Sequence, residues 1–180
     1  MKKIFIALLI ALTCNPIIMA LPVTLVPQEI KDIKTAEPGF DLYCQLHRRF
    51  REQEEKVKGS GKQEFANRLE QALANDYKLI YFYQVLNSKQ KLVAILGFGV
   101  RKELYWGKYM WIDSLVVDEP YRKQGIAAEI MKYAESYAKN NKLTSVQLST
   151  GLDRIPAQEL YNKLMYEKVG FAYRKIFQYD

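Results

Sequence analysis

Residues 116–128 combine signals that together restrict the local structure strongly. An apolar, β-prone run over 110–117 stops before Pro120, which predicts a strand that ends there. A basic turn with a glycine follows, and an amphipathic helical pattern begins at Gly125. The first backbone N–H groups of a helix lack internal partners and lie at the positive end of the helix dipole. The stretch therefore predicts a strand, turn and helix that can hold an anion such as a pyrophosphate.

The turn carries the residue types that an anion site needs. Gly125 lets the backbone approach an anion closely, because glycine has no side chain. Arg122 and Lys123 bring positive charge beside it. An ordinary turn at the start of a helix shows the same short pattern, so the turn alone leaves both interpretations open.

Residues 122–127, Arg-Lys-Gln-Gly-Ile-Ala, resemble the Arg/Gln-x-x-Gly-x-Gly/Ala signature of the GNAT superfamily of N-acetyltransferases. In that family the loop binds the pyrophosphate of acetyl-CoA, so the resemblance implies a site for this co-substrate. It covers residues 76–180 well and residues 22–75 loosely. The residues that it assigns to coenzyme binding here are Leu115, Val116, Val117, Arg122, Lys123, Gln124, Gly125, Ile126, Ala127, Ala128 and Arg154.

A second motif follows the next expected strand. Residues 149–161 read Ser-Thr-Gly-Leu-Asp-Arg-Ile-Pro-Ala-Gln-Glu-Leu-Tyr, which resembles a GNAT subset with Ser/Thr-Gly-x-x-Arg-x-x-Ala-x-x-Leu/Phe-Tyr at this point. The family's closing Gly-Phe pair is Gly170-Phe171, later than usual, so the last helix is expected to be long. Arg154 is expected to contact a coenzyme phosphate or an acidic acceptor group, or else to pair with Asp153 or Glu159.

The periodicity predicts one α/β domain over residues 21–180, because the chain is long enough for one core and short for two. The expected strands are 22–26, 78–86, 91–100, 109–117, 144–149 and 173–179, and the expected helices are 40–57, 63–74, 125–140 and 155–168. The order β-α-α-β-β-β-α-β-α-β is that of the GNAT fold, an α+β fold with a mixed sheet. The resemblance places acetyl-CoA where the strands over 109–117 and 144–149 splay apart.

The expected function is N-acetyl transfer from acetyl-CoA to a primary amine of a small molecule or protein, by direct attack in a ternary complex. The resemblance puts the general acid on Tyr161, with Tyr166 as the alternative, and a neutral tyrosine with a pKa of about 10 suits protonation of a departing thiolate. Asp113 is the candidate base, because aspartate inside a strand is disfavoured unless something needs it. A structural or outward-facing role for Asp113, and Glu103 as the base, stay open. Oxyanion stabilisation is expected from backbone N–H groups over 115–117.

Other classes of function are weighed against this one. A catalytically silent GNAT-fold module that binds CoA or a protein is the alternative. Nucleic-acid binding is not expected, because the net charge of +7 is dispersed and no reader motif appears. No metal site is expected either, since His47 is the sole histidine. His47 borders the acceptor pocket by resemblance, although a single surface histidine is more often a bystander.

The N-terminus has the layout of a secretory signal peptide over residues 1–20: Lys2 and Lys3, an apolar run over 4–12, Pro16, and the small residue Ala20. The run is shorter than the roughly 20 residues that span a bilayer, so no permanent membrane span is expected. A cleaved signal implies a secreted or periplasmic protein, and the cytoplasm is the alternative because acetyl-CoA is cytosolic. The acceptor and the oligomeric state stay open.

Overall fold

The computed structural model describes residues 24–47, 52 and 54–170. Five strands form one sheet in the order β1-β2-β3-β4-β5. They are β1 at Leu25–Ile30, β2 at Lys78–Leu86, β3 at Lys89–Glu103, β4 at Gly107–Val117 and β5 at Val146–Leu148. Neighbours from β1 to β4 are antiparallel and β4 pairs with β5 in parallel, so the prediction of a mixed sheet is confirmed. The proposed signal over 1–20 and the predicted strand over 173–179 lie outside the described residues.

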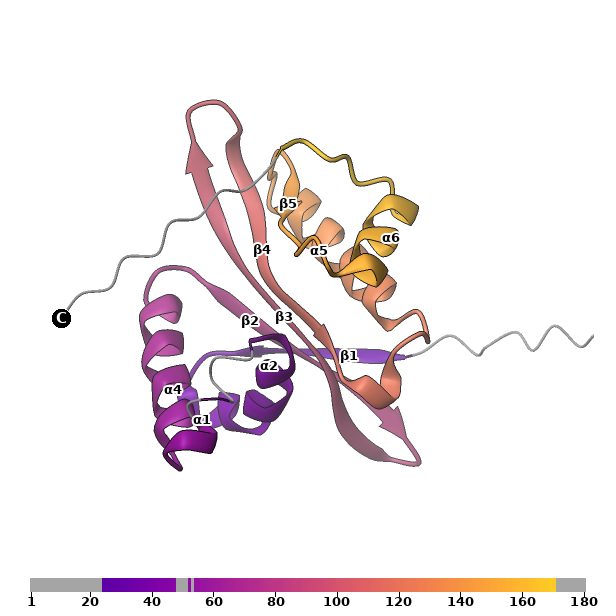
Figure 1. Ribbon diagram of the computed structural model, residues 1–180. Helices are drawn as coiled ribbons and strands as arrows, with labels where there is room; N and C mark the ends of the chain where they lie inside the picture. Colours follow the sequence, from indigo (N-terminus) through magenta and orange to yellow (C-terminus); the bar gives the residue numbers. More distant parts are fainter. Residues whose placement is uncertain (1–23, 48–51, 53, 171–180) are drawn as a thin grey trace, which may run out of the picture.

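Helices cover both faces of the sheet (Figure 1). One face carries α1 at Ile33–Ala36, α2 at Phe40–Leu46 and α4 at Ser60–Leu73, and the other carries α5 at Ile126–Asn140 and α6 at Ile155–Lys163. Short 3-10 turns lie at Glu37–Gly39 and Glu119–Tyr121. The helices and the sheet between them make the α/β architecture that the sequence predicts.

Each face of the sheet has its own apolar cluster. On the α5 face, Ile126, Ile130 and Ala134 are spaced by four residues, so they form one buried stripe along the helix. This stripe belongs to the same cluster as Phe98 of β3 and Met110 of β4. The cluster on the opposite face includes Phe40, Phe65, Leu69, Tyr81 and Val116. The sheet is therefore held between two hydrophobic layers, and β4 contributes to both.

Two predicted helices end earlier than the sequence pattern indicates. The helix predicted over 40–57 ends at Leu46 in α2, because His47 leaves helical geometry with φ −115° and ψ 80°. The helix predicted over 155–168 ends at Lys163, because Met165 has a left-handed φ of 63° that stops the helix. The prediction of an unusually long last helix is therefore wrong. Strand ends differ from the predicted ones by at most four residues, as is common for element boundaries.

Candidate active site

A bulge in the middle of β4 sets the position of the site. Gly97 of β3 lies opposite Ser114, and Phe98 lies opposite Ile112, so Asp113 is the extra residue. An extra residue in one strand shifts the alternation of side chains, so that two consecutive side chains can face the same side of the sheet. The bulge therefore lets Asp113 and Ser114 both face α2 and α4.

Hydrogen bonds join both bulge residues to the helical layer. The Tyr77 hydroxyl donates to Asp113 Oδ1 at 2.7 Å. The buried Ser114 hydroxyl donates to the Tyr43 hydroxyl oxygen at 3.2 Å and lies 3.3 Å from His47 Nε2. A carboxylate, two phenols and an imidazole thus converge where β4 bulges.

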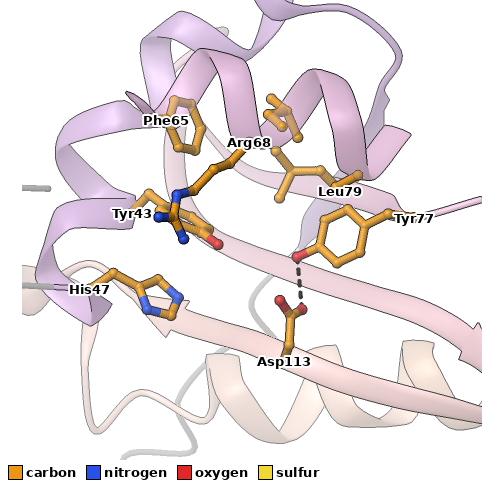
Figure 2. A pocket seen from close by; sticks show the side chains of 9 residues that line it. Tyr43, His47, Phe65, Arg68, Tyr77, Leu79 and Asp113 are labelled. Carbon is orange, nitrogen blue, oxygen red and sulfur yellow. Dashed lines mark hydrogen bonds between the residues drawn. The ribbon is translucent and has the colours of Figure 1, made fainter. Parts of the chain in front are cut away.

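These side chains line a cavity of about 360 Å³ between the sheet and α4 (Figure 2). Figure 2 shows Asp113 pointing from β4 toward the Tyr77 hydroxyl, while the Arg68 side chain extends from α4 into the same space. The volume suits a small molecule, since ligand pockets start at about 300 Å³. The lining residues are Tyr43, His47, Phe65, Arg68, Leu69, Ala72, Tyr77, Leu79 and Asp113.

The pocket changes the proton affinity of its two basic groups. Burial raises the pKa of the Asp113 carboxyl, although the hydrogen bond from Tyr77 acts in the opposite direction. Burial lowers the pKa of His47, and the positive charge of Arg154 adds to this effect. A raised carboxylate pKa gives a stronger base, and a lowered imidazole pKa keeps His47 neutral near pH 7. The pocket therefore holds groups that can accept a proton from an amine.

Gly97 makes room for this arrangement. A Cβ at Gly97 would lie 2.0 Å from the Tyr77 hydroxyl oxygen and 3.1 Å from Ser114 Cβ. Only glycine therefore lets the Tyr77 side chain lie across β3 and reach Asp113. A glycine inside a strand often marks such a close approach, and this is the sequence signal that could have located the pocket.

β4 and β5 separate at the bulge. Their pairing runs from Met110 opposite Val146 to Ile112 opposite Leu148, and β4 then continues to Val117 paired with β3 but not with β5. The strands predicted to splay therefore do so next to Asp113. The splay leaves one edge of β4 open over its last residues, where a ligand can pair with the backbone as an added strand does.

Two of the three predicted strand residues present their backbone to this splay. Val117 O accepts a hydrogen bond from Arg122 Nε at 3.0 Å, so it points away from β3. Backbone direction alternates along a strand, so Leu115 faces the same way as Val117. Val116 directs its backbone toward β3 and buries its side chain in the cluster of α2 and α4. Leu115 and Val117, and not Val116, can therefore contact a ligand in the splay through their backbone.

α5 begins at an open and basic loop. Gly125 precedes the helix with a left-handed φ of 82°, and a Cβ there would meet nothing within 4 Å. Lys123 is exposed and has a φ of 61°. None of the described side chains caps the start of α5, so the backbone N–H groups of its first turn, at Ile126, Ala127 and Ala128, can bind an anion.

The side chains of Arg122 and Gln124 fold back onto the protein. Arg122 Nη2 donates to Gln45 Oε1 of α2 at 3.0 Å, and Gln45 Nε2 donates to Asp118 Oδ1 at 2.9 Å. Gln124 Nε2 donates to Pro120 O at 3.1 Å. The loop predicted to bind the coenzyme is therefore tied to α2, on the side of the Asp113 pocket.

Arg154 makes a contact that the sequence did not predict. It precedes α6, and its Nη2 donates to Leu46 O at the end of α2 at 3.2 Å. The contact joins a helix from one face of the sheet to a helix from the other. The positive charge of Arg154 lowers the pKa of His47 and that of Tyr161.

The two candidate acids, Tyr161 and Tyr166, have different surroundings. The Tyr166 hydroxyl donates to Glu135 Oε1 of α5 at 3.1 Å, and burial together with Glu135 raises the pKa of Tyr166. Tyr161 is half-buried on α6, where burial raises its pKa and the charge of Arg154 lowers it. A hydroxyl held by a carboxylate is a poor donor to a thiolate, so the geometry favours Tyr161 as the acid.

The alternative base lies elsewhere. Glu103 is opposite Gly107 at the turn of the β3–β4 hairpin and accepts a hydrogen bond from the Tyr109 hydroxyl. The six steps along the strand from Gly107 to Asp113 span roughly 20 Å. Glu103 is therefore remote from the pocket that Asp113 lines.

The structure adds residues that sequence analysis did not assign to the site. His47, expected either to border an acceptor pocket by resemblance or to be a bystander, lines the pocket with Tyr43, Arg68 and Tyr77. Tyr43, His47 and Arg68 lie where the resemblance to the family is loosest, and Tyr77, between α4 and β2, lies outside both motifs, so no motif pointed to them. Within the described part of the chain, no set of three or more His, Cys, Asp or Glu side chains could hold a metal, and no helix has the length and apolar character needed to cross a membrane.

Comparisons with known proteins agree with this geometry. The acetyltransferase (GNAT) family model matches residues 42–166, which include most of α2, the bulge, the loop before α5, and Tyr161 and Tyr166. The uncharacterized N-acetyltransferase YhdJ of Bacillus subtilis (strain 168) is 28% identical over 108 residues, which are 60% of this chain and 71% of that protein. Human N-acetyltransferase 8 is 27% identical over 92 residues, 51% of this chain and 40% of that protein.

The fold also matches solved structures. Glucosamine-6-phosphate N-acetyltransferase from Arabidopsis thaliana superposes with a TM-score of 0.62 over 86% of this chain and 99% of that one, at 19% identity. At this identity the match concerns the fold alone, whereas the family model covers more than half of the sequence. The chain therefore belongs to the GNAT family of acetyltransferases.

Proposed function

We propose that the protein moves the acetyl group of acetyl-CoA to the primary amine of an acceptor bound in the Asp113 pocket, by direct attack in a ternary complex. One observation carries this proposal: the pocket and the splay meet at the same bulge. Asp113 faces the pocket, and Leu115 and Val117 turn their backbone to the open edge of β4. An amine and a thioester bound on these two sides would lie against each other.

The donor site is proposed from the residues that fit the chemistry of acetyl-CoA. The first turn of α5, with Arg122 and Lys123 beside it, supplies N–H groups and positive charge for a pyrophosphate. Leu115 and Val117 offer backbone hydrogen bonds to the amide-containing arm of the coenzyme. Arg154 is the arginine of the Thr-Gly-x-x-Arg motif, and it supplies positive charge beside the end of α2.

The proposed reaction needs an amine without its extra proton. Asp113, with His47 as a second acceptor, takes that proton, and the amine nitrogen then attacks the thioester carbonyl carbon. The carbon–nitrogen bond forms, the carbon–sulfur bond breaks, and the second amine proton leaves through the same pocket. Tyr161 donates its hydroxyl proton to the departing CoA thiolate and is reprotonated from solvent. Backbone N–H groups near Leu115 stabilise the oxyanion. The net products are an acetamide, CoA and one proton.

Calorimetry with acetyl-CoA, followed by a thiol-release assay with a set of primary amines, tests the proposal. The control carries Arg122→Glu and Gly125→Trp, which reverse the loop charge and fill the space beside the helix N-terminus. We expect micromolar binding that the control loses, and acetylation of at least one amine. No binding to folded protein would overturn the proposal. Binding without turnover on any amine would favour a silent module that holds CoA.

A further inference from the structure

The acceptor pocket has apolar walls beside its polar groups. Phe65 and Leu69 of α4 and Leu79 of β2 are each at most 5% exposed, and the Tyr43 and Phe65 rings lie 5.0 Å apart. Such walls stabilise hydrocarbon or aromatic groups by removing them from water. They give few partners to hydroxyl groups, and burying a hydroxyl without a hydrogen bond is unfavourable. These walls therefore fit an acceptor with an apolar body.

The charged groups of the pocket have opposite signs. Asp113 lies on the strand side, and Arg68 extends in from α4 near Tyr43 and His47 (Figure 2). His47 adds no full charge near pH 7, because its pKa is lowered. A ligand that matches this pattern carries an amine for Asp113 and an acidic group for Arg68.

The present contacts of Arg68 are compatible with a ligand. Its Nε pairs with Glu64 Oε1, one turn earlier on α4, at 2.5 Å, and the Arg68 side chain is 51% exposed. An exposed pair of this kind contributes little stability. The guanidinium carries five donors in a planar fork, so it can hold a carboxylate while it keeps neighbours on its other edge.

Taken with the acetyl transfer proposed above, on which this step rests, these features define a class of acceptor. We propose that the acceptor is an α-amino acid with an apolar or aromatic side chain. Its amino group lies at Asp113, its carboxylate at Arg68, and its side chain against Phe65, Leu69 and Leu79. A cavity of about 360 Å³ suits a molecule of this size, and the acetyl group goes to the α-amino nitrogen.

Matched ligands separate the carboxylate from the rest of the acceptor. Phenylalanine and 2-phenylethylamine share the ring and the amine, and differ in the carboxylate. Leucine and 3-methylbutylamine form a second pair. We expect kcat/KM for each amino acid to exceed that for its amine partner by about 10- to 100-fold, the effect of one charge-assisted, bidentate contact.

Arg68→Gln tests the assigned contact. This variant should lower kcat/KM for phenylalanine by about 10- to 100-fold more than kcat/KM for 2-phenylethylamine, so the ratio between the two falls to about one. Lys62→Gln, on the same helix with its ammonium over the Phe40 ring, is the matched control and should change neither value. Circular dichroism and thermal unfolding confirm that both variants fold.

Equal rates for the two members of each pair, or an equal loss on both in Arg68→Gln, would overturn the amino-acid assignment. If such amines are acetylated without preference, acetyl transfer stands and this inference fails. Calorimetry with phenylalanine tests the assignment of the acceptor through its binding affinity, independently of acetylation. If phenylalanine binds the wild type and binds Arg68→Gln more weakly, the inference is supported. If phenylalanine does not bind the CoA-loaded wild type, the inference is rejected. Failure of acetyl-CoA itself to bind rejects the proposed function instead.

Discussion

Asp113 and Ser114 are neighbours in sequence, and both face the side of the sheet that carries α2 and α4 because one extra residue interrupts the pairing of β4. Tyr77 and Tyr43 then fix the two side chains from the helical layer. In a regular strand, one of the two would face α5 instead. The chemistry assigned to Asp113 therefore depends on the backbone as much as on the carboxylate.

Asp113→Asn should lower kcat/KM by about 10²- to 10⁴-fold, the usual contribution of a general base. Asparagine keeps an oxygen that can accept the hydrogen bond from Tyr77, so the loss would report on proton transfer. Steady-state rates with a reactive amine measure it. An unchanged rate would move the base to His47.

The same variant should be more stable than the wild type at neutral pH. Burial raises the pKa of Asp113 in the folded state above 3.8, so the folded state binds this proton more tightly than the unfolded state does. The ionised carboxylate therefore destabilises the fold as pH rises through the raised pKa. We expect Asp113→Asn to have a higher Tm at about pH 7, a gain that disappears below pH 3.8. Asp41→Asn on α2 controls for the general loss of a carboxylate, and an equal Tm gain there would contradict this account.

Tyr161→Phe should reduce kcat by about 10²- to 10⁴-fold while the Kd for acetyl-CoA stays the same. Tyr166→Phe removes a hydroxyl that bonds to Glu135, so it should lower stability modestly and leave kcat near the wild-type value. Single-turnover rates and calorimetry compare the two variants. A larger kcat loss in Tyr166→Phe would reverse the assignment.

At the scale of elements, β3 and β4 carry the site together: β4 supplies the bulge, and β3 supplies the glycine that faces it. Gly97→Ala would place a methyl group 2.0 Å from the Tyr77 hydroxyl oxygen. We expect a loss of about 1–3 kcal/mol in unfolding free energy from overpacking, together with a loss of acetylation as Tyr77 leaves Asp113. Gly99→Ala, where a Cβ meets nothing within 4 Å, is the control on the same strand. Equal effects at the two positions would contradict the proposed steric role.

The sequence predicted some elements better than others for physical reasons. β2 has the predicted bounds Lys78–Leu86, and α5 starts within one residue of its prediction, because strong periodicity and a glycine mark them. The bulge at Asp113 leaves no composition signal, since it arises from pairing with β3. α2 ends at Leu46 although helical periodicity continues in the sequence. The loop that we propose for coenzyme binding could therefore be located from a local motif, whereas the pocket is built from distant segments and has only Gly97 as a local signal.

At the scale of the whole molecule, the sheet divides the apolar interior into two clusters. Ile130 on α5 is fully buried in one of them. Ile130→Ala should lower the unfolding free energy by about 2–5 kcal/mol through lost burial and a remaining cavity. Urea denaturation measures it, with an unchanged m-value expected. Leu104→Ala, at an exposed position on the β3–β4 hairpin, should change stability by less than about 0.5 kcal/mol.

The end of α2 contacts both the loop before α5 and the segment before α6. Gln45 Oε1 accepts a hydrogen bond from Arg122 of the loop, and Leu46 O accepts one from Arg154 before α6. Tyr43 and His47 of the same segment line the pocket. A pyrophosphate that recruits Arg122 competes with Gln45 and so loosens or repositions α2. We expect this competition to set the order of events: the donor adds first, the acceptor adds to the loaded enzyme, and the acetylated product departs before CoA.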